Sequence, residues 1–355
     1  MAGLIFREAV AGDHAALERL FRETSMAGAI RIGSDRSPDF FGASRVQAEE
    51  PCVWGAFTGD GRAVGVFSAG NRRVWLGGGK TDMRYLSDLR IHPDWRKGTM
   101  LAKGFRLMRE RVFAKGEWAQ TLVLEQNLSA LEFLRSSRAG LPEYREAGRY
   151  KNWLLPFQSV SRPTHQVRKA CPDDLPAIQS LLDDFSRRRS FSPVIDLAKL
   201  GEPYLNGLSV DDFLVAEKNG EIRGAMGLWD QGAFQRLRVD SYSKRMALTR
   251  PFLNIHAHLS GGPKLPAQGD VIPMVKVTAL GFSGDDPFIL RSLLNVARNT
   301  GKRGILSIGL SESDPLVAAL DGMKARIFIG QHFLVGWNGE PPSWTEPFGF
   351  DAGRI

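Results

Sequence analysis

The sequence of 355 residues predicts an α+β protein made of two tandem copies of one fold, because the same order of elements occurs twice. A strand pattern followed by a capped amphipathic helix occupies residues 4–21 and returns at 166–185. Two apolar runs around a glycine turn, the pattern of a β-hairpin, occupy residues 53–68 and return at 213–229. Both repeats lie about 160 residues apart, which suits two domains of roughly 150–200 residues.

Beyond its hairpin, the first copy continues with a strand, a helix and further strands. Residues 85–91 are a strand pattern that ends before Pro93, since proline cannot donate to a strand ladder. Apolar residues spaced by three and four then predict a helix to about Ala114. The copy is completed by a strand at 121–127, a short helix at 129–137 and a last strand at 150–157.

The two copies are expected to form a first domain at residues 1–158 and a second at 167–338. The polar, proline-containing segment 159–166 is expected to link them. Between residues 229 and 272 the second copy carries an insertion, in which we expect a helix. The proline-rich segment 339–355 predicts a tail that lies as a strap over the surface and joins neither sheet.

The composition is that of an ordinary globular protein, with 43% hydrophobic and 24% charged residues. No run approaches the roughly 20 apolar residues of a membrane helix, and the first residues do not match a signal peptide, so no membrane association is expected. Cys52 and Cys171 lie far apart, as expected of reduced thiols in the cytoplasm. His256 and His258 have no Cys, Asp or Glu at ligand spacing, so no metal site is expected.

Much of the formal net charge of +8 comes from the first copy. Residues 1–158 hold 24 Lys and Arg against 18 Asp and Glu. This surplus agrees with a polyanionic cofactor, although scattered surface arginines are the ordinary explanation. A nucleic acid is not an expected partner, because the sequence has neither aromatic-basic interleaving nor a helix-turn-helix.

The stretch most informative about function is the strand, basic turn and helix of residues 85–111. The turn brings Arg96 and Lys97 to the start of a helix, where unpaired N–H groups and the helix dipole favour an anion. Gly98 stands alone, so neither the dinucleotide motif G-x-G-x-x-G nor a Walker motif is present. Such units also occur widely in α/β proteins without any ligand, but this one suits a diphosphate.

Residues 89–99, L-R-I-H-P-D-W-R-K-G-T, resemble the fourth strand and pyrophosphate loop of the GCN5-related N-acetyltransferase (GNAT) superfamily. The match is partial and has two registers. In one register Arg96 takes the arginine of the pattern and Thr99 stands at its central glycine. In the other register Gly98 takes the glycine and Trp95 stands at the arginine.

Residues 123–134 resemble the superfamily's fifth strand and following helix, with Asn127, Ala130 and Phe133 at matching spacing. The resemblance implies two tandem GNAT-like domains, each a mixed, mostly antiparallel sheet flanked by helices. It also implies acetyl-CoA, or another acyl-CoA, as co-substrate, bound in a V between the fourth and fifth strands. The residues that it implies for this co-substrate are Leu89, Arg90, Ile91, Arg96, Lys97, Gly98, Thr99, Met100, Leu101, Asn127 and Phe133.

Acylation of an amine needs a base that accepts the amine proton. Asp88 and Glu125, on the two strands of the implied V, are the candidates, although an acidic residue near a strand end commonly pairs with an arginine instead. Where the superfamily has a tyrosine as general acid, this chain has Leu134. The departure points to a slow enzyme, to a substitute such as Tyr144 or Tyr150, or to no acyl transfer.

A loop at residues 26–43 combines glycine, arginine and paired phenylalanines. Arg31, Phe40 and Phe41 are the expected lining of an acceptor pocket there, because binding residues often lie on loops. The ordinary alternative is that the two phenylalanines anchor the loop to the core.

In the second copy, Asp285 and Asp286 replace the basic residues at the equivalent helix start. These carboxylates would cap the helix but repel a diphosphate, so we expect no CoA there. The sequence therefore predicts an N-acetyltransferase that acts on an amine of a small molecule or peptide, with its active site in the first copy. The alternative is a catalytically weak or inactive CoA-binding or acyl-CoA-binding protein of the same fold. A serine hydrolase is not expected, because no G-x-S-x-G occurs.

Overall fold

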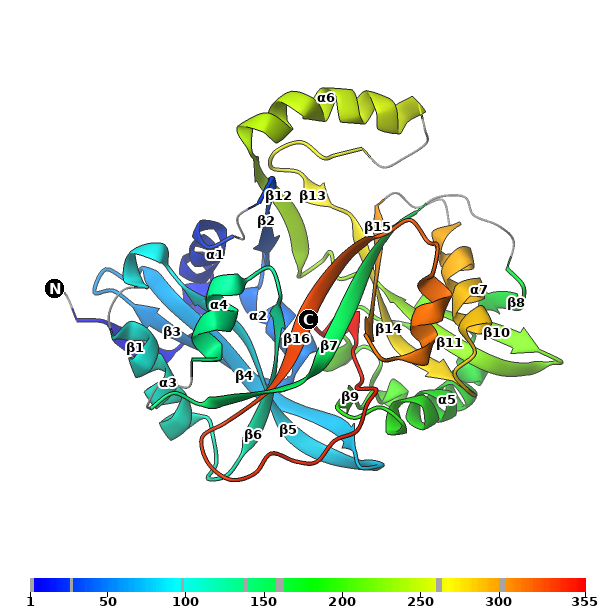
Figure 1. The fold of residues 1–355 in the computed structure, drawn as a ribbon, viewed down its shortest axis with the longest axis horizontal. Coiled ribbons are helices and arrows are strands. Elements are labelled where there is room, and N and C mark those ends of the chain that lie inside the picture. Colours follow the sequence, from blue (N-terminus) through cyan, green and yellow to red (C-terminus); the bar gives the residue numbers. More distant parts are fainter. Residues whose placement is uncertain are drawn as a thin grey trace.

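The computed structural model describes residues 3–25, 28–96, 99–136, 140–157, 163–259, 264–299 and 304–355. A sheet of 13 strands runs through both halves of the molecule (Figure 1). Its main path has the order β1-β3-β4-β5-β6-β16-β7-β15-β14-β11-β10-β8, and β9 pairs with β4. The α+β class predicted from the sequence is confirmed.

The first half supplies one end of this sheet and four helices. Its strands are β1 (Ile5–Glu8), β3 (Glu49–Phe57), β4 (Ala63–Leu76), β5 (Gly79–Ile91), β6 (Trp118–Leu124) and β7 (Glu143–Pro156). Its helices are α1 (His14–Glu23), α2 (Phe40–Gln47), α3 (Met100–Arg111) and α4 (Leu128–Leu134). The predicted linker, 159–166, falls partly outside the described residues.

The second half repeats this arrangement at the other end of the sheet. Its strands are β8 (Gln166–Lys169), β9 (Ser192–Pro193), β10 (Phe213–Lys218), β11 (Glu221–Trp229), β14 (Met274–Phe282), β15 (Ile305–Ser311) and β16 (Arg326–Gly336). Its long helices are α5 (Leu175–Arg187) and α7 (Pro287–Arg298). The repeated hairpins predicted from the sequence are β3–β4 and β10–β11.

The halves are joined by an exchange of strands. β16, from the second half, lies between β6 and β7 of the first half, antiparallel to both. β7 in turn pairs with β15 of the second half from Tyr150–Ser311 to Pro156–Ile305. The two sheets are therefore one hydrogen-bonded sheet, a feature that no local sequence pattern specifies.

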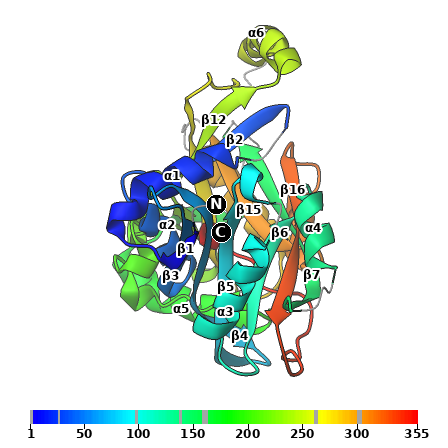
Figure 2. The ribbon, with the colours of Figure 1, turned by 90° about the vertical axis from the view of Figure 1, so that its left-hand side faces the viewer.

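Helices cover the two faces of the first half's sheet separately. Val66 and Phe67 are consecutive in β4 and so point to opposite faces. Val66 packs with Phe21 of α1, whereas Phe67 packs with Phe105 of α3 and Leu131 of α4. One face therefore carries α1 and α2, and the other carries α3 and α4 (Figures 1 and 2).

The tail after β16 begins at the surface, as expected of a strap, with Glu340, Ser343 and Thr345 exposed, but its last residues are buried, which the prolines did not indicate. Phe348 is 1% exposed and Arg354 is fully buried. Arg354 donates through Nη1 to the carbonyl oxygen of Val46 in α2, and Arg72 of β4 donates to the carbonyl oxygen of Arg354. The tail thus packs between the two halves and ends near the centre of the molecule (Figure 1).

A small extension projects from the body. β2 (Ile30–Asp35) of the first half pairs with β12 (Arg236–Tyr242), which also pairs with β13 (Val271–Ile272), in a separate sheet of three strands. The helix expected in the insertion is α6 (Lys244–Leu259), which follows β12 (Figure 1). In the described part of the chain, no helix is long and apolar enough to cross a membrane.

Candidate active site

β5 and β6 run parallel but pair only from Arg84–Ala119 to Leu86–Thr121. Thr121 Oγ1 donates to the carbonyl oxygen of Leu86 at 2.9 Å where the pairing ends. Beyond this point β5 stays paired with β4 and β6 with β16, so the two strands diverge. We call the resulting V the first opening. Leu89, on its β5 edge, is 45% exposed.

A β-bulge shapes this edge of β5. Between the pairs Ser68–Ser87 and Val66–Arg90, β5 has one residue more than β4. Asp88 lies in the bulge with φ of 60°, in the left-handed region that aspartate tolerates better than most residues. The bulge therefore redirects the Asp88 side chain beside the point where the strands diverge.

Asp88 forms a buried bidentate ion pair with Arg36, with N–O distances of 2.8 and 2.6 Å. Their side chains are 8% and 3% exposed, and Ser68 Oγ donates to the same carboxylate at 2.9 Å. The Arg36 guanidinium also lies over the rings of Phe21 and Phe40. Burial favours the neutral acid, but Arg36 outweighs it and holds the pKa of Asp88 below its ordinary value. Asp88 is thus an ion-paired carboxylate and a poor proton acceptor.

Glu125, the other candidate base, directly follows β6 and pairs with Arg149 at 2.7 and 3.0 Å. Its side chain is 33% exposed, and Arg149 also pairs with Glu312. Each predicted base therefore has an arginine partner, and no described contact joins the two carboxylates.

The start of α3 lies beyond the end of β5. Its N-cap residue, Thr99, makes no side-chain cap hydrogen bond, and the first turn has no acidic residue. The exposed Arg96 donates from Nε to the carbonyl oxygen of Ile91 at 3.2 Å. Lys97 and Gly98 lie outside the described residues. An uncapped helix start beside an arginine, next to a strand with an open edge, suits a phosphate-bearing ligand.

The residues expected on α4 divide into one exposed and two packed side chains. Asn127 is the exposed N-cap residue of α4 and makes no side-chain cap hydrogen bond. Phe133 and Leu134 pack into the cluster beneath α3, and Leu134 is 9% exposed. The two possible substitutes for the missing tyrosine are also packed: Tyr144 contacts Phe333 and Tyr150 stacks on Phe350, and burial raises the pKa of both phenols.

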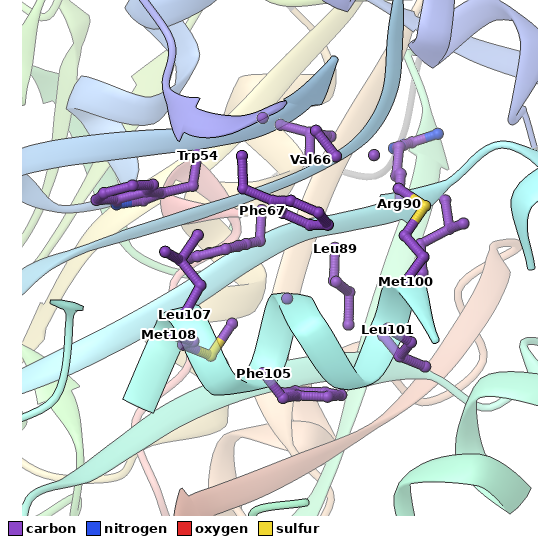
Figure 3. Close-up of a pocket in the computed structure, with 16 residues that line it drawn as sticks. Trp54, Val66, Phe67, Leu89, Arg90, Met100, Leu101, Phe105, Leu107 and Met108 are labelled. Carbon is purple, nitrogen blue, oxygen red and sulfur yellow. The ribbon is translucent and has the colours of Figure 1, made fainter. Parts of the chain in front are cut away.

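An apolar pocket lies between α3 and the sheet, beside the first opening, and its roughly 410 Å³ of empty space includes space that is open to solvent. Phe67 and Leu89 approach it from the strands, and Met100, Leu101 and Phe105 approach it from α3 (Figure 3). Gly65 of β4 also lines this pocket. A Cβ at this position would clash with the end of the Met100 side chain, so the glycine leaves room for that side chain. The lining of the pocket is therefore of a kind that suits an apolar group close to β5.

The residues expected to line an acceptor pocket are not brought together. Phe40 is fully buried against Phe21, with ring centroids 5.0 Å apart, and Phe41 packs partly buried on the same cluster. Arg31 is exposed on β2, where it pairs with Ser241 of β12. The two phenylalanines are the first residues of α2 and anchor this segment to the core, as in the alternative interpretation, and Phe40 supports Arg36.

The second half has an equivalent opening that is filled by the tail. β14 and β15 run parallel only from Met274–Ile305 to Lys276–Ser307. Beyond the last of these pairs, β14 has a β-bulge that contains Ala279, whose φ is 50°. Asp88 has the corresponding position in the bulge of β5.

Asp351 of the tail accepts hydrogen bonds at this bulge, from Thr278 Oγ1 at 2.8 Å and from the Ala279 N–H at 3.2 Å. The ring of Phe350 lies against Gly309 of β15, where a Cβ would come within 1.9 Å of it. In the described residues, no comparable tail contact is made at Asp88–Ile91. The second opening is therefore closed by the chain itself.

The start of α7, beside the second opening, is capped. Asp286 accepts from the Phe288 N–H at 2.9 Å, and Asp285 pairs with Arg188 and Arg189. The expected capping is confirmed for Asp286, whereas Asp285 makes ion pairs instead. Both this helix start and the neighbouring opening are thus occupied by groups of the protein.

Replacing Asp351 by alanine is expected to lower the free energy of unfolding by about 1–3 kcal/mol, because the buried Thr278 hydroxyl and Ala279 N–H lose their acceptor. Urea denaturation measures this difference. Glu346→Ala, at an exposed position of the same tail, is the control and should change the value by about 0.5 kcal/mol or less. Equal stability of both variants would contradict the closure by Asp351.

Lys276 lies where β14 and β15 diverge, and its Nζ donates to the main-chain oxygen of Ile355 at 2.7 Å. The side chain is half-buried. Burial, helped by repulsion from Arg36 and opposed by Asp351, lowers the pKa of Lys276 to about 7. Arg36, the partner of Asp88, contributes to this shift, so its guanidinium lies within electrostatic range of Lys276. Lys276 is therefore a nitrogen base beside the second opening that is partly neutral at neutral pH.

Sequence reasoning did not select Arg36, Ser68 or Lys276. Nothing local distinguishes Arg36 from Arg31, which lies in the same loop. A lone lysine in the apolar run M-V-K-V-T, residues 274–278, was an available signal for Lys276, since an apolar strand leaves a charged group to be desolvated. No group of His, Cys, Asp or Glu suited to a metal occurs in the described part of the chain.

No protein-family model and no curated protein matches this sequence. Among solved structures, the chain is similar to a GCN5-related N-acetyltransferase from Anabaena variabilis, at 10% identity and a TM-score of 0.50, over 94% of this chain and 72% of that chain. It is also similar to N-myristoyltransferase of Saccharomyces cerevisiae with bound myristoyl-CoA, at 11% identity and a TM-score of 0.58, over 94% and 78% of the two chains. A structure of that enzyme with myristoyl-CoA and inhibitors gives 11% identity and a TM-score of 0.61, over 100% and 87%. At these identities the likeness is one of fold.

Proposed function

We propose that this chain, which has the GNAT fold in two tandem copies, is an N-acyltransferase that uses acetyl-CoA or another acyl-CoA. The observation that carries the proposal is the difference between the two openings. The first opening has an uncovered β5 edge and an uncapped helix start, whereas the second is closed by Asp351 and its neighbouring helix is capped by Asp286. The structural neighbours include an N-acetyltransferase and an enzyme with bound myristoyl-CoA, which supports the same chemistry here.

The first opening can bind such a co-substrate along its length. The N–H groups at Thr99–Leu101 and the Arg96 guanidinium would bind the diphosphate at the start of α3. The main chain at Leu89–Ile91 would bind the amide-bearing arm as an added strand, with Asn127 beside it, as the family resemblance implies. The thioester would then lie near Asp88, where the two strands diverge.

In this proposal, the apolar pocket beside β5 binds the acyl group of the co-substrate. Its lining is formed by Phe67, Leu89, Phe105 and neighbouring apolar side chains (Figure 3). An acyl chain longer than acetyl would remove more apolar surface from water there, which favours binding by roughly 0.8 kcal/mol per buried methylene. Affinity for acyl-CoA that rises with chain length would assign the pocket to the acyl group.

In this proposal, the protein removes the proton that the acceptor amine loses during acyl transfer. The thioester supplies the activated acyl group, whose carbonyl carbon bonds to the amine nitrogen as its bond to sulfur breaks. Lys276, when neutral, accepts the proton that the amine nitrogen loses, and the thiolate leaves with the coenzyme. Asp88 holds Arg36 in place and so maintains the positive charge that helps to lower the pKa of Lys276. The proposed acceptor is an amine of a small molecule or peptide.

Calorimetric titration with acetyl-CoA and with a longer acyl-CoA tests the binding site. Arg96→Glu is expected to weaken the affinity by about tenfold or more, because it replaces a cation beside the phosphates with an anion. Arg109→Glu makes the same charge change in the last turn of α3, at another exposed position, and should leave the affinity nearly unchanged. Equal affinities in the two variants, or no heat with any acyl-CoA, would refute the proposed site.

Release of free thiol with a panel of amines separates an enzyme from a binding protein. The replacement of the usual tyrosine by Leu134 motivates this second possibility, since a leucine cannot protonate the leaving thiolate. We expect thiol release that depends on both the amine and the acyl-CoA. Tight binding without release across the panel would favour the acyl-CoA-binding protein.

A further inference from the structure

Helix α6 stands clear of the body of the molecule on the β2–β12–β13 extension (Figures 1 and 2). One of its faces is held by the segment that returns from it. Asn254 exchanges two hydrogen bonds with the main chain of Leu265, at 2.7 and 3.0 Å, and Arg250 Nε donates to the same carbonyl oxygen. These contacts fix the rotation of the helix about its axis.

The other face of α6 carries a stripe of exposed apolar side chains. Leu248, Phe252, Ile255 and Leu259 follow one another at spacings of four, three and four, so they lie on one side of the helix. Their exposed fractions are 75%, 73%, 59% and 81%. An ordinary surface helix turns such a stripe toward the core, whereas α6 turns it outward. A stripe of this size exposed on a projecting helix marks a surface that is covered in use.

The charge around the stripe is positive only. Residues 244–265 contain Lys244, Arg245, Arg250 and Lys264 but no Asp or Glu. Lys244 and Arg245 are exposed and lie four and three residues before Leu248, so they border the stripe. A protein partner with an apolar groove would not require this one-sided charge, whereas an anionic lipid surface attracts it.

We propose that α6 binds the surface of a membrane that contains anionic lipids. The stripe Leu248–Phe252–Ile255–Leu259 enters the boundary between headgroups and acyl chains, and the bordering cations contact lipid phosphates or carboxylates. Its 16 residues span about 24 Å, so the helix lies in the plane of the surface and does not cross it. The inference does not depend on the proposed acyltransferase activity.

Sedimentation with vesicles tests the proposal. We expect the whole protein to pellet with vesicles of phosphatidylcholine and phosphatidylserine and to remain in solution with phosphatidylcholine alone. The double variant Leu248→Ser/Phe252→Ser should lower the partition onto anionic vesicles by about tenfold or more, since both inserted side chains lose their apolar surface. Lys244→Gln/Arg245→Gln should weaken binding and reduce its sensitivity to salt.

Phe288→Ser provides the matched control, because Phe288 is 62% exposed on α7, on the body of the molecule. It should pellet like the unchanged protein, and all variants should keep its thermal midpoint. Failure of the unchanged protein to bind anionic vesicles, or undiminished binding by Leu248→Ser/Phe252→Ser, would overturn the proposal. Sedimentation equilibrium could instead show that the unchanged protein is a dimer and that the double variant is a monomer. This result would assign the stripe to a contact with a second copy of the chain and would also overturn the proposal.

Discussion

Replacing Arg36 by methionine is expected to lower the free energy of unfolding by about 3–5 kcal/mol. The substitution removes one partner of an ion pair whose side chains are 3% and 8% exposed, and it leaves the buried Asp88 carboxylate without a hydrogen-bonded cation, since Arg90 acts on it only through its charge. Ser68 donates only one hydrogen bond to that carboxylate, which does not replace two charge-assisted bonds. Urea denaturation at neutral pH measures the difference.

Arg7→Met is the matched control. Arg7 also binds a carboxylate through two nitrogens, that of Asp13, but its side chain is 41% exposed. Water replaces a lost partner at such a position, so the expected cost is about 1 kcal/mol or less. The double variant Arg36→Met/Asp88→Leu should recover much of the stability that Arg36→Met loses, because no uncompensated charge remains. Equal costs for Arg36→Met and Arg7→Met would contradict the buried ion pair.

The Arg36→Met effect should depend on pH. In the unchanged protein the pKa of Asp88 lies below its unfolded value, so the ion pair contributes fully above the unfolded pKa. The contribution is lost as pH falls through the folded pKa. The difference in stability between Arg36→Met and the unchanged protein should therefore be largest at neutral pH and should shrink in acid. A difference that is constant with pH would mean that Arg36 acts through packing on Phe21 and Phe40 alone.

Replacing Lys276 by methionine is expected to lower kcat by about 10²–10⁴-fold, the usual contribution of a general base. With a pKa of about 7, Lys276 is neutral above that pH and protonated below it. The kcat of the unchanged protein should therefore fall about tenfold per pH unit below 7, and Lys276→Met should lose this acid limb. Thiol release measured from pH 5 to 9 gives both results.

A stability measurement tests the lowered pKa of Lys276 independently of its role in catalysis. The pKa of Lys276 is lowered from its unfolded value of 10.5, so between about pH 7 and 10.5 the unfolded chain binds the extra proton. The stability of the unchanged protein should rise with pH over this range, and the rise should be missing in Lys276→Met. Lys151→Met, at a 26% exposed lysine paired with Glu312, is the control and should keep kcat and its pH profile. Unchanged kcat in Lys276→Met would refute the role of Lys276.

Local sequence predicted most elements because their signals depend on near neighbours. The hairpin around Asn219-Gly220 and the helix expected within residues 166–185 follow from turn chemistry and apolar spacing, and both are present, as β10–β11 and as α5 at Leu175–Arg187. Boundaries moved by a few residues, as at β6, expected over 121–127 and found at Trp118–Leu124. The uncapped α3 and the capped α7 also follow from residues within one helical turn.

The arrangement of the candidate site depends on contacts between residues that are distant in the chain. Asp88 was expected to be a free base or to pair with a neighbouring arginine, but its partner is Arg36, 52 residues away. The β-bulge that turns Asp88 toward Arg36 depends on the register of β4 and β5. A sequence pattern cannot decide among several arginines when strand register and loop path select the partner.

The sequence by itself determined the two copies, the positive helix start of the first and the negative helix start of the second, because each depends on residues within a few positions of one another. Only the tertiary structure decided which opening is free. The tail, at residues 348–354, reaches back past β16 to Thr278 and Ala279 and closes the second opening. The tertiary structure also decided that Arg36 pairs with Asp88 and that Lys276 is desolvated. Burial and pairing are properties of the packed molecule and not of one segment.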